Sequence, residues 1–228
     1  MIAHKKEFFG GFFMLAMFVV VLIIVFSPIF EGRNGLEYLD ALYNSISKNS
    51  AYYIPDVKKE ADEFVGSSVS VTLDMGDKER ARQTAPLFMK AGAMVNTSGT
   101  ELKVTGDLGK ILENCLSDAD YMYHNEGEKL SGKYGYDERR VLLNWWIAFK
   151  RMEKGLNNQK KFKEAKVISM TQQKAVEACY NYYKIEPQKI GDKIGIVIFS
   201  LVFYVIYTLW YGFSIMFMFE GWGMKLEH

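Results

Sequence analysis

Histidine is scarce in this chain, and the short motifs of the common catalytic families are absent. The chain has 3 histidines among 228 residues, and only His124 lies in the polar middle of the sequence. It contains no G-x-S-x-G elbow, no Walker loop, no H-E-x-x-H pair and no C-x-x-C pair. These motifs mark many hydrolases, nucleotide-binding proteins, zinc peptidases and thiol redox proteins. We therefore expect a protein that is not an enzyme, with no catalytic residues and no cofactor.

An excess of charge of one sign is also missing. The chain has 28 Lys and Arg against 27 Asp and Glu, which gives a formal net charge of +1. Three residues of each sign lie outside residues 31–193, so this middle segment holds 25 basic and 24 acidic residues. A protein that binds nucleic acid needs a clear positive excess. The composition therefore argues against nucleic acid as a partner.

Charged residues are missing altogether from two long apolar runs, residues 8–30 (23 residues) and 194–219 (26 residues). About 20 apolar residues cross a bilayer as a helix, in which the backbone satisfies its own hydrogen bonds. The predicted fold class is a membrane protein with two transmembrane helices flanking a mostly helical α+β extracytoplasmic domain. A secretory signal peptide is the alternative for the first run. However, the run exceeds the roughly 7–15 apolar residues of a signal peptide, and no small-x-small cleavage site follows it.

The charges beside the runs predict the topology. Lys5 and Lys6 closely precede the first run, and basic residues in short tails stay in the cytoplasm. We expect the inner membrane of a bacterium, with both termini cytoplasmic and the central domain periplasmic or extracellular. The predicted segments are a tail (1–7), the first span (8–30), the extracytoplasmic domain (31–193), the second span (194–219) and a second tail (220–228) in which Leu226–His228 resemble the remnant of a tag.

Hydrophobic periodicity predicts a small α+β unit over about residues 66–125. Residues 69–75 alternate between apolar and polar, which is typical of a half-buried strand. Asp77 is the predicted N-cap of a helix that reaches Ala91, with Pro86 as a kink or break. Two short strands are predicted at 94–97 and 101–105. Asp107 then caps a helix whose apolar residues follow a 3.6-residue spacing as far as Tyr123.

Helical segments are predicted to surround this unit. They cover residues 36–46 and 56–65, a helix capped by Asp137 and interrupted at Gly155, and residues 157–168 and 171–183. Three glycines within 124–136 predict a loop there. Trp145 and Trp146 are consecutive and point in different directions on a helix. One can lie in the core, while the other makes a second contact or is exposed as an interaction anchor.

The densest group of potential metal ligands consists of Asp118, Asp120, His124, Glu126 and Glu128. Asp120 and His124 are four residues apart and can share one face of a helix. The EF-hand spacing of glycine and bidentate glutamate is absent. Solvated charge at the end of a helix is the simpler interpretation. Asp120 and His124 are therefore weak candidates, and we expect no metal.

The chain has two cysteines, Cys115 and Cys179. In an oxidising compartment an even pair favours a disulfide. The alternative is two separately buried thiols, because cysteine is among the most buried residue types. Both cysteines lie on the apolar faces of predicted helices, and the sequence leaves the two alternatives equal.

The second apolar run carries a stripe of polar side chains at steps of three and four residues, whereas residues 12–26 of the first run have none. Such side chains favour a position against protein or water, so the stripe is predicted to face the first span, another copy of the chain or another subunit. A water-filled pore is the alternative, although no acidic ring or glycine-rich filter accompanies it. The members of this stripe are Ser200, Tyr204, Tyr207, Thr208, Tyr211 and Ser214.

These features favour a membrane-anchored extracytoplasmic binding module, such as a sensor, an adaptor or an assembly subunit. The layout resembles the input half of bacterial sensory receptors, in topology only. The expected partners are the lipid bilayer and, through the second span, another copy or another membrane protein. The alternative function is a subunit of an oligomeric two-span channel or transport complex. The identity of the ligand or partner and the oligomeric state do not follow from the sequence.

Overall fold

The computed structural model describes residues 2–30 and 32–224 and divides into two compact units. The first unit combines both ends of the chain, up to Ile46 and from Gln188 onward. The second unit is the continuous segment Ser47–Pro187. This second unit lies within the predicted middle segment, residues 31–193. The predicted tag remnant at residues 226–228 lies outside the described residues.

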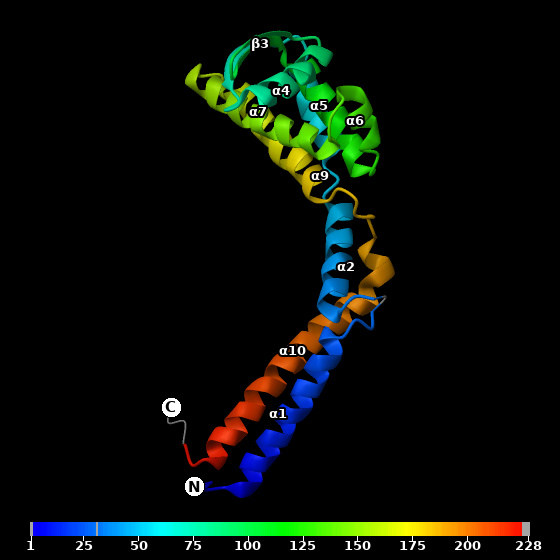
Figure 1. Cartoon of the computed structure of the whole chain (residues 1–228), viewed down its shortest axis with the longest axis vertical. Coiled ribbons are helices and arrows are strands. Elements are labelled where there is room, and N and C mark those ends of the chain that lie inside the picture. The colour runs from blue at the N-terminus through cyan, green and yellow to red at the C-terminus, as the bar shows by residue number, and fades with distance from the viewer. Residues whose placement is uncertain (1, 31, 225–228) are drawn as a thin grey trace. The chain divides into compact units, whose positions relative to one another are not determined.

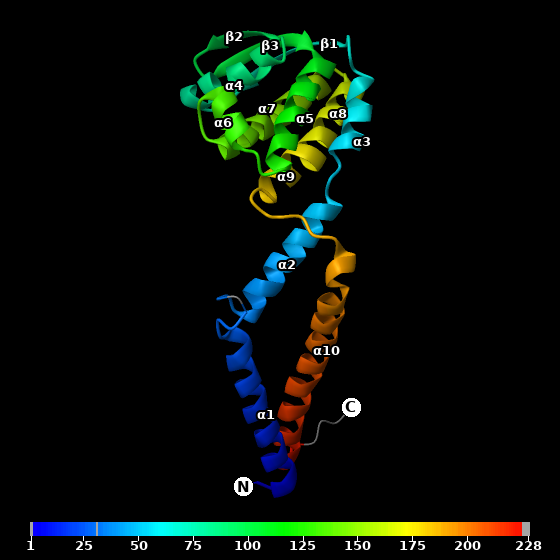
Figure 2. The same ribbon diagram turned by 90° about the vertical axis from the view of Figure 1, so that its right-hand side faces the viewer.

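The first unit is built from α1 (Lys5–Phe26), most of α2 (Gly35–Ser50) and α10 (Ile190–Gly221). By length and composition, α1 and α10 are long and apolar enough to cross a membrane. They pack against each other (Figure 1), close together near the two termini and diverging away from them in Figure 2. Helix α1 ends at Phe26 rather than at residue 30, because the residue before Pro28 is pushed into an extended conformation. Helix α10 begins at Ile190, four residues before the predicted span.

Glycine allows the backbones of α1 and α10 to touch. A Cβ atom on Gly11 would lie 2.7 Å from the carbonyl oxygen of Ser214 and 2.8 Å from the amide nitrogen of Met218. A Cβ atom on Gly221 would lie 2.5 Å from the amide nitrogen of Phe8. Small residues at such crossings are typical of helix pairs in membranes, where close packing replaces the hydrophobic effect.

Replacing Gly11 with leucine is expected to push α1 and α10 apart, because the new side chain collides with backbone atoms that cannot rotate away. Overpacking of this kind costs about 1–3 kcal/mol. Spin labels at the exposed positions Ile23 and Leu201 would report the change as a longer and broader distance distribution. Gly10 is the matched control, since nothing lies within 4 Å of a Cβ atom built there. Wild-type distances in both leucine variants would contradict the described crossing.

The second unit contains an antiparallel sheet of three strands in the order β1-β3-β2. Its strands are β1 (Ser68–Asp74), β2 (Met94–Ser98) and β3 (Glu101–Asp107). Val71 and Val95 both pair with Val104 of the central strand. The alternation predicted for the first strand is confirmed, because Val69, Val71 and Leu73 are buried between exposed neighbours.

Helices cover one face of this sheet (Figure 2) and enclose the core with it. They are α3 (Ile54–Asp62), α4 (Lys78–Lys90), α5 (Leu108–Tyr123), α6 (Glu128–Tyr134), α7 (Glu138–Asn158), α8 (Phe162–Thr171), the π-helix η1 (Gln172–Glu177) and α9 (Ala178–Asn181). The three predicted aspartate N-caps are confirmed. The side chains of Asp77, Asp107 and Asp137 each accept a hydrogen bond from the backbone nitrogen three residues later.

Several predicted boundaries in the second unit are wrong. The predicted loop at 124–136 contains α6, whose C-cap Gly135 takes the left-handed conformation at φ 79°. Gly155 does not interrupt α7, which continues to Asn158; a Cβ atom at this glycine would lie in ordinary contact with the Val71 side chain, at 3.5 Å. Pro86 lies inside α4 without ending it. The predicted helix at 157–168 is instead divided between α7 and α8, with a turn at Lys160 (φ 60°).

Candidate functional site

A buried aspartate holds three helices of the second unit together. Asp118 on α5 is fully buried, and its Oδ1 accepts a hydrogen bond from Lys133 Nζ at 2.7 Å. Its Oδ2 accepts hydrogen bonds from the Tyr134 hydroxyl at 2.6 Å and from Trp145 Nε1 at 2.9 Å. Burial and the Asp118 carboxylate raise the pKa of Tyr134, which therefore stays protonated as a donor. Asp118 thus has a structural role and is not available to a metal.

Asp120 and His124 do share one face of α5, as their spacing predicts. His124 Nδ1 lies 3.5 Å from Asp120 Oδ1, which also accepts a 2.8 Å hydrogen bond from the Tyr52 hydroxyl. Burial and this hydrogen bond raise the pKa of Tyr52 to about 12. Within residues 2–30 and 32–224, no group of three His, Cys, Asp or Glu side chains gathers that could hold a metal ion. Through the hydrogen bond from Tyr52, Asp120 links α5 to the start of the unit.

Lys48 joins the first and last segments of the second unit. It is fully buried, and its Nζ donates hydrogen bonds to the Ile185 carbonyl at 2.6 Å and to Asn125 Oδ1 at 2.9 Å. The same ammonium lies 5.1 Å from the centre of the Tyr123 ring. Burial lowers the pKa of Lys48, against the opposing effect of Glu186. This polar clamp was not predictable, because its members are up to 137 residues apart in sequence.

Both cysteines are free and buried, which corresponds to the second of the two alternatives left by the sequence. Burial raises the pKa of the Cys115 thiol well above its usual value and raises that of Cys179 to about 12. Thiolate, rather than thiol, is the reactive form of cysteine. Neither side chain is therefore placed for nucleophilic chemistry at neutral pH.

Thiol titration is expected to find two free thiols in unreduced, unfolded protein and almost none that react quickly in the native protein. The reason is that both sulfur atoms are buried and protonated. Ellman's reagent, added with and without denaturant, measures both values. A value near zero in the unfolded, unreduced protein would show a disulfide and contradict the described arrangement.

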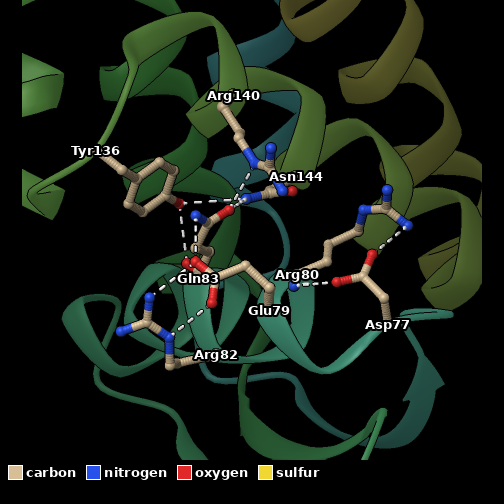
Figure 3. Close-up of polar contacts among 8 residues, drawn as sticks. All are labelled: Asp77, Glu79, Arg80, Arg82, Gln83, Tyr136, Arg140 and Asn144. Carbon is tan, nitrogen blue, oxygen red and sulfur yellow. Dashed lines mark hydrogen bonds and ion pairs between the residues drawn. The ribbon is translucent and has the colours of Figure 1, made fainter.

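A second polar network fastens α4 to α7, with Gln83 at its centre (Figure 3). Its Oε1 accepts hydrogen bonds from Arg140 Nε at 2.7 Å and from Asn144 Nδ2 at 3.5 Å, and its carbonyl accepts one from the Tyr136 hydroxyl. Its Nε2 donates to Glu79. The Oδ1 atom of Asn144 is buried without a protein partner. These contacts align the two helices.

The surface feature best suited to binding is an apolar groove between α7 and the η1–α9 segment, with a volume of about 250 Å³. We call it the Trp146 groove. Its floor and walls are apolar apart from one carboxylate and one amide, and Leu143 remains 38 % exposed at its edge. The residues that line it are Leu142, Leu143, Trp146, Val176, Glu177, Tyr180 and Asn181.

Trp146 is held by hydrogen bonds to both its ring and its backbone. Its Nε1 donates to Glu177 Oε2 at 3.1 Å, and its backbone carbonyl accepts a 3.0 Å hydrogen bond from Gln172 Nε2. Lys150 Nζ lies 4.9 Å from the centre of the Trp146 ring. The wall that supplies Gln172 and Glu177 is the π-helix η1, and single π turns within longer helices are frequent at functional sites.

The two consecutive tryptophans thus have separate roles. Trp145 is fully buried in the core, and Trp146 is partly exposed at the groove. The sequence pointed to this division. It did not point to the groove itself, because residues of η1 and α9 reach Trp146 only in the folded unit.

The polar stripe of α10 is divided between two environments. Ser200 and Ser214 are buried, and Ser200 Oγ lies 2.6 Å from the Tyr43 hydroxyl of α2. The Tyr207 ring stacks on Phe18 of α1 with 4.6 Å between the ring centres, and Tyr211 lies at 5.3 Å from the same ring. In contrast, Tyr204 is 67 % exposed, and Thr208 is exposed and donates only to the carbonyl of Tyr204.

One contact inside the helix pair was missed at the sequence level. Trp210 Nε1 donates a 3.0 Å hydrogen bond to the carbonyl of Met14, so this tryptophan joins α1 to α10. The chain matches no family model, no curated protein and no solved structure.

Proposed function

We propose that this chain is a membrane-anchored binding module, and that its second unit holds a partner protein at the Trp146 groove. The observation that carries the proposal is the groove itself: an apolar hollow with a fixed, partly exposed tryptophan at its edge. Tryptophan, tyrosine and arginine supply most of the binding energy at protein interfaces. Trp146 and Tyr180 provide two such residues within one hollow. The module acts without catalysis, as a sensor, an adaptor or an assembly subunit.

The anchor consists of α1 and α10, which we propose as spans of the inner membrane of a bacterium. In this proposal both termini are cytoplasmic and the second unit is periplasmic or extracellular. Lys5 and Lys6 support this orientation, because basic residues in short tails are retained in the cytoplasm. The packing of Gly11 against the backbone of α10 supports a preformed helical hairpin within the bilayer.

Site-specific photo-crosslinking in cells tests the binding proposal. A photoreactive amino acid in place of Leu143 at the edge of the groove is expected to capture a discrete protein. Met94 is the matched control, because it is a more exposed apolar residue (70 %) on the edge strand β2 of the same unit. Capture at Leu143 and not at Met94 supports the groove as the binding surface. Equal capture at both positions, or none at Leu143, contradicts it.

A channel or transport subunit is the second candidate, and the exposed Tyr204 favours it. Tyr204 lies near the middle of α10, and its hydroxyl has no partner within the described residues. In a bilayer such a group gains from a polar partner on another helix or from a water-filled pore. Ion flux through liposomes that contain the protein distinguishes the candidates. Robust wild-type conductance lost in a Tyr204→Leu variant would favour the channel, and zero conductance favours the binding module.

A further inference from the structure

We infer that the Trp146 groove selects an acidic segment of its partner, with one apolar side chain in the groove and Asp or Glu on both sides of it. This inference rests on the proposed function and adds the chemistry of the partner. It follows from the charges around the groove: the nearby carboxylates accept hydrogen bonds within the unit, whereas the cations Arg139 and Lys150 lie against aromatic rings and form no ion pair with a carboxylate of the described residues.

The carboxylates beside the groove already accept hydrogen bonds from the protein. Glu177 accepts from Trp146 Nε1 at 3.1 Å. Glu138 accepts from the Tyr183 hydroxyl at 2.9 Å and lies 3.9 Å from Lys184 Nζ. A basic partner that bound these carboxylates would compete with their internal contacts. Those contacts hold Trp146 and the segment that follows α9 in place. The acidic groups of this surface are therefore poorly placed to recognise a basic segment.

The cations at the two ends of the groove are differently placed. Arg139 is one turn before Leu143 on α7, and its guanidinium lies 5.7 Å from the centre of the Tyr183 ring. Lys150 is one turn after Trp146, and its ammonium lies above the Trp146 ring. Both side chains are exposed, and neither forms an ion pair with any carboxylate in the part of the chain that the structure describes. An aromatic ring next to each cation favours a limited range of positions for it.

The separation of the cations predicts the length of the segment. Arg139 and Lys150 are 11 residues apart on α7, or about 16 Å at 1.5 Å per helical residue. An extended peptide of about five residues covers this distance at roughly 3.3 Å per residue. The groove lies between the two cations, next to Leu143 and Trp146. The complementary ligand is therefore a short peptide with a central apolar residue and acidic residues two or three positions to either side.

Synthetic peptides test this inference on the full chain in nanodiscs of neutral phosphatidylcholine. The probes are a fluorescent acidic peptide, EDSLSDE, its basic counterpart KKSLSKK and the anchor-deleted EDSASDE. We expect EDSLSDE to bind about tenfold or more tightly than the other two, and its affinity to fall as salt is raised, since exposed charges are screened. Equal affinities for EDSLSDE and KKSLSKK would overturn the inference.

Charge reversal locates the effect. In the Arg139→Glu/Lys150→Glu variant, the affinity for EDSLSDE should fall by about threefold or more for each cation reversed, as expected for exposed ion pairs. The affinity of the same variant for KKSLSKK should rise. Lys103→Glu/Lys110→Glu is the control, because these exposed lysines lie on β3 and α5, outside the groove lining. An equal loss of EDSLSDE binding in both variants, or no loss in the groove variant, would contradict the inference.

The failure of this inference and the failure of the proposed function give different results. If EDSLSDE and KKSLSKK bind the wild-type chain equally and Trp146→Ala abolishes both, the groove binds partners without charge selection, and only the inference is overturned. If no peptide binds and a photoreactive residue at Leu143 captures nothing, the proposed function fails as well. Binding of phosphatidylglycerol vesicles through Arg139 and Lys150, in place of EDSLSDE, would overturn the inference in favour of a membrane surface.

Discussion

The Asp118→Ala variant is expected to lose about 3–5 kcal/mol of the free energy of unfolding of the second unit, the cost typical of removing one partner of a buried ion pair. Asp118 is fully buried and accepts hydrogen bonds from Lys133, Tyr134 and Trp145. Alanine would remove the acceptor of the Tyr134 hydroxyl and of the Trp145 indole N–H. It would also take the ion-pair partner from the Lys133 ammonium, which keeps its 2.7 Å hydrogen bond to Asn114 Oδ1. The hydroxyl and the indole N–H would keep their desolvation cost once their acceptor is gone.

Chemical unfolding of the full chain in detergent, followed by tryptophan fluorescence, measures this loss. Asp56→Ala is the control, because Asp56 is 79 % exposed and pairs only with Lys59 at 3.7 Å. Such a surface pair contributes about 0–1 kcal/mol. The Tyr134→Phe variant removes a single donor and should cost about 1 kcal/mol, which preserves the test if Asp118→Ala does not fold. Similar losses in Asp56→Ala and Asp118→Ala would contradict the central role of the buried carboxylate.

The Trp146→Ala variant is expected to weaken binding of the partner captured at Leu143 by about 30-fold or more. This corresponds to about 2 kcal/mol, the lower limit for a dominant interface residue. The alanine variant removes the aromatic edge of the groove and the donor that holds Glu177 in place. Trp146→Phe retains a ring but not the indole N–H. Its affinity for the partner should lie between those of the wild type and of Trp146→Ala. Affinity is measured by titration of the purified full chain with that partner.

Phe162→Ala provides the matched control for Trp146→Ala. Phe162 is an aromatic residue of the same unit that is 63 % exposed and lies at the start of α8, outside the groove lining. Near-UV circular dichroism of each variant shows whether the unit remains folded. Equal weakening by Phe162→Ala, or unchanged affinity in folded Trp146→Ala, would remove the groove from the binding surface.

Features of the fold that depend on local physics could be predicted from the sequence. The alternation of residues 69–75 marked β1, since a half-buried strand has a period of two. Asp77, Asp107 and Asp137 marked three helix starts, because a short acceptor at the N-cap bonds a backbone N–H of the first turn. The two apolar runs likewise predicted α1 and α10 from composition and length.

Features that depend on contacts distant in sequence could not be predicted. The Asp118 network draws donors from α6 and α7, and nothing in the sequence around Asp118 distinguishes it from its exposed neighbours. The Trp146 groove forms only when η1 and α9 reach α7. The glycines of the helix crossing carry no information about their partners, although a glycine in an apolar run permits close approach. Thus a Cβ atom on Gly11 would collide with the backbone of α10, whereas a Cβ atom on Gly10 would have nothing within 4 Å.

The proposed function requires α1 and α10 to cross a membrane and to place the second unit on the side opposite the termini. Labelling of intact cells with a membrane-impermeant amine reagent, followed by peptide mass spectrometry, tests this arrangement. A lysine reagent is preferable to a thiol reagent, because Cys115 and Cys179 are buried. We expect modification of the exposed Lys58 and Lys103 in intact cells, and of Lys5 and Lys6 only after lysis. Modification of Lys5 and Lys6 in intact cells, with Lys58 and Lys103 protected until lysis, would contradict this arrangement.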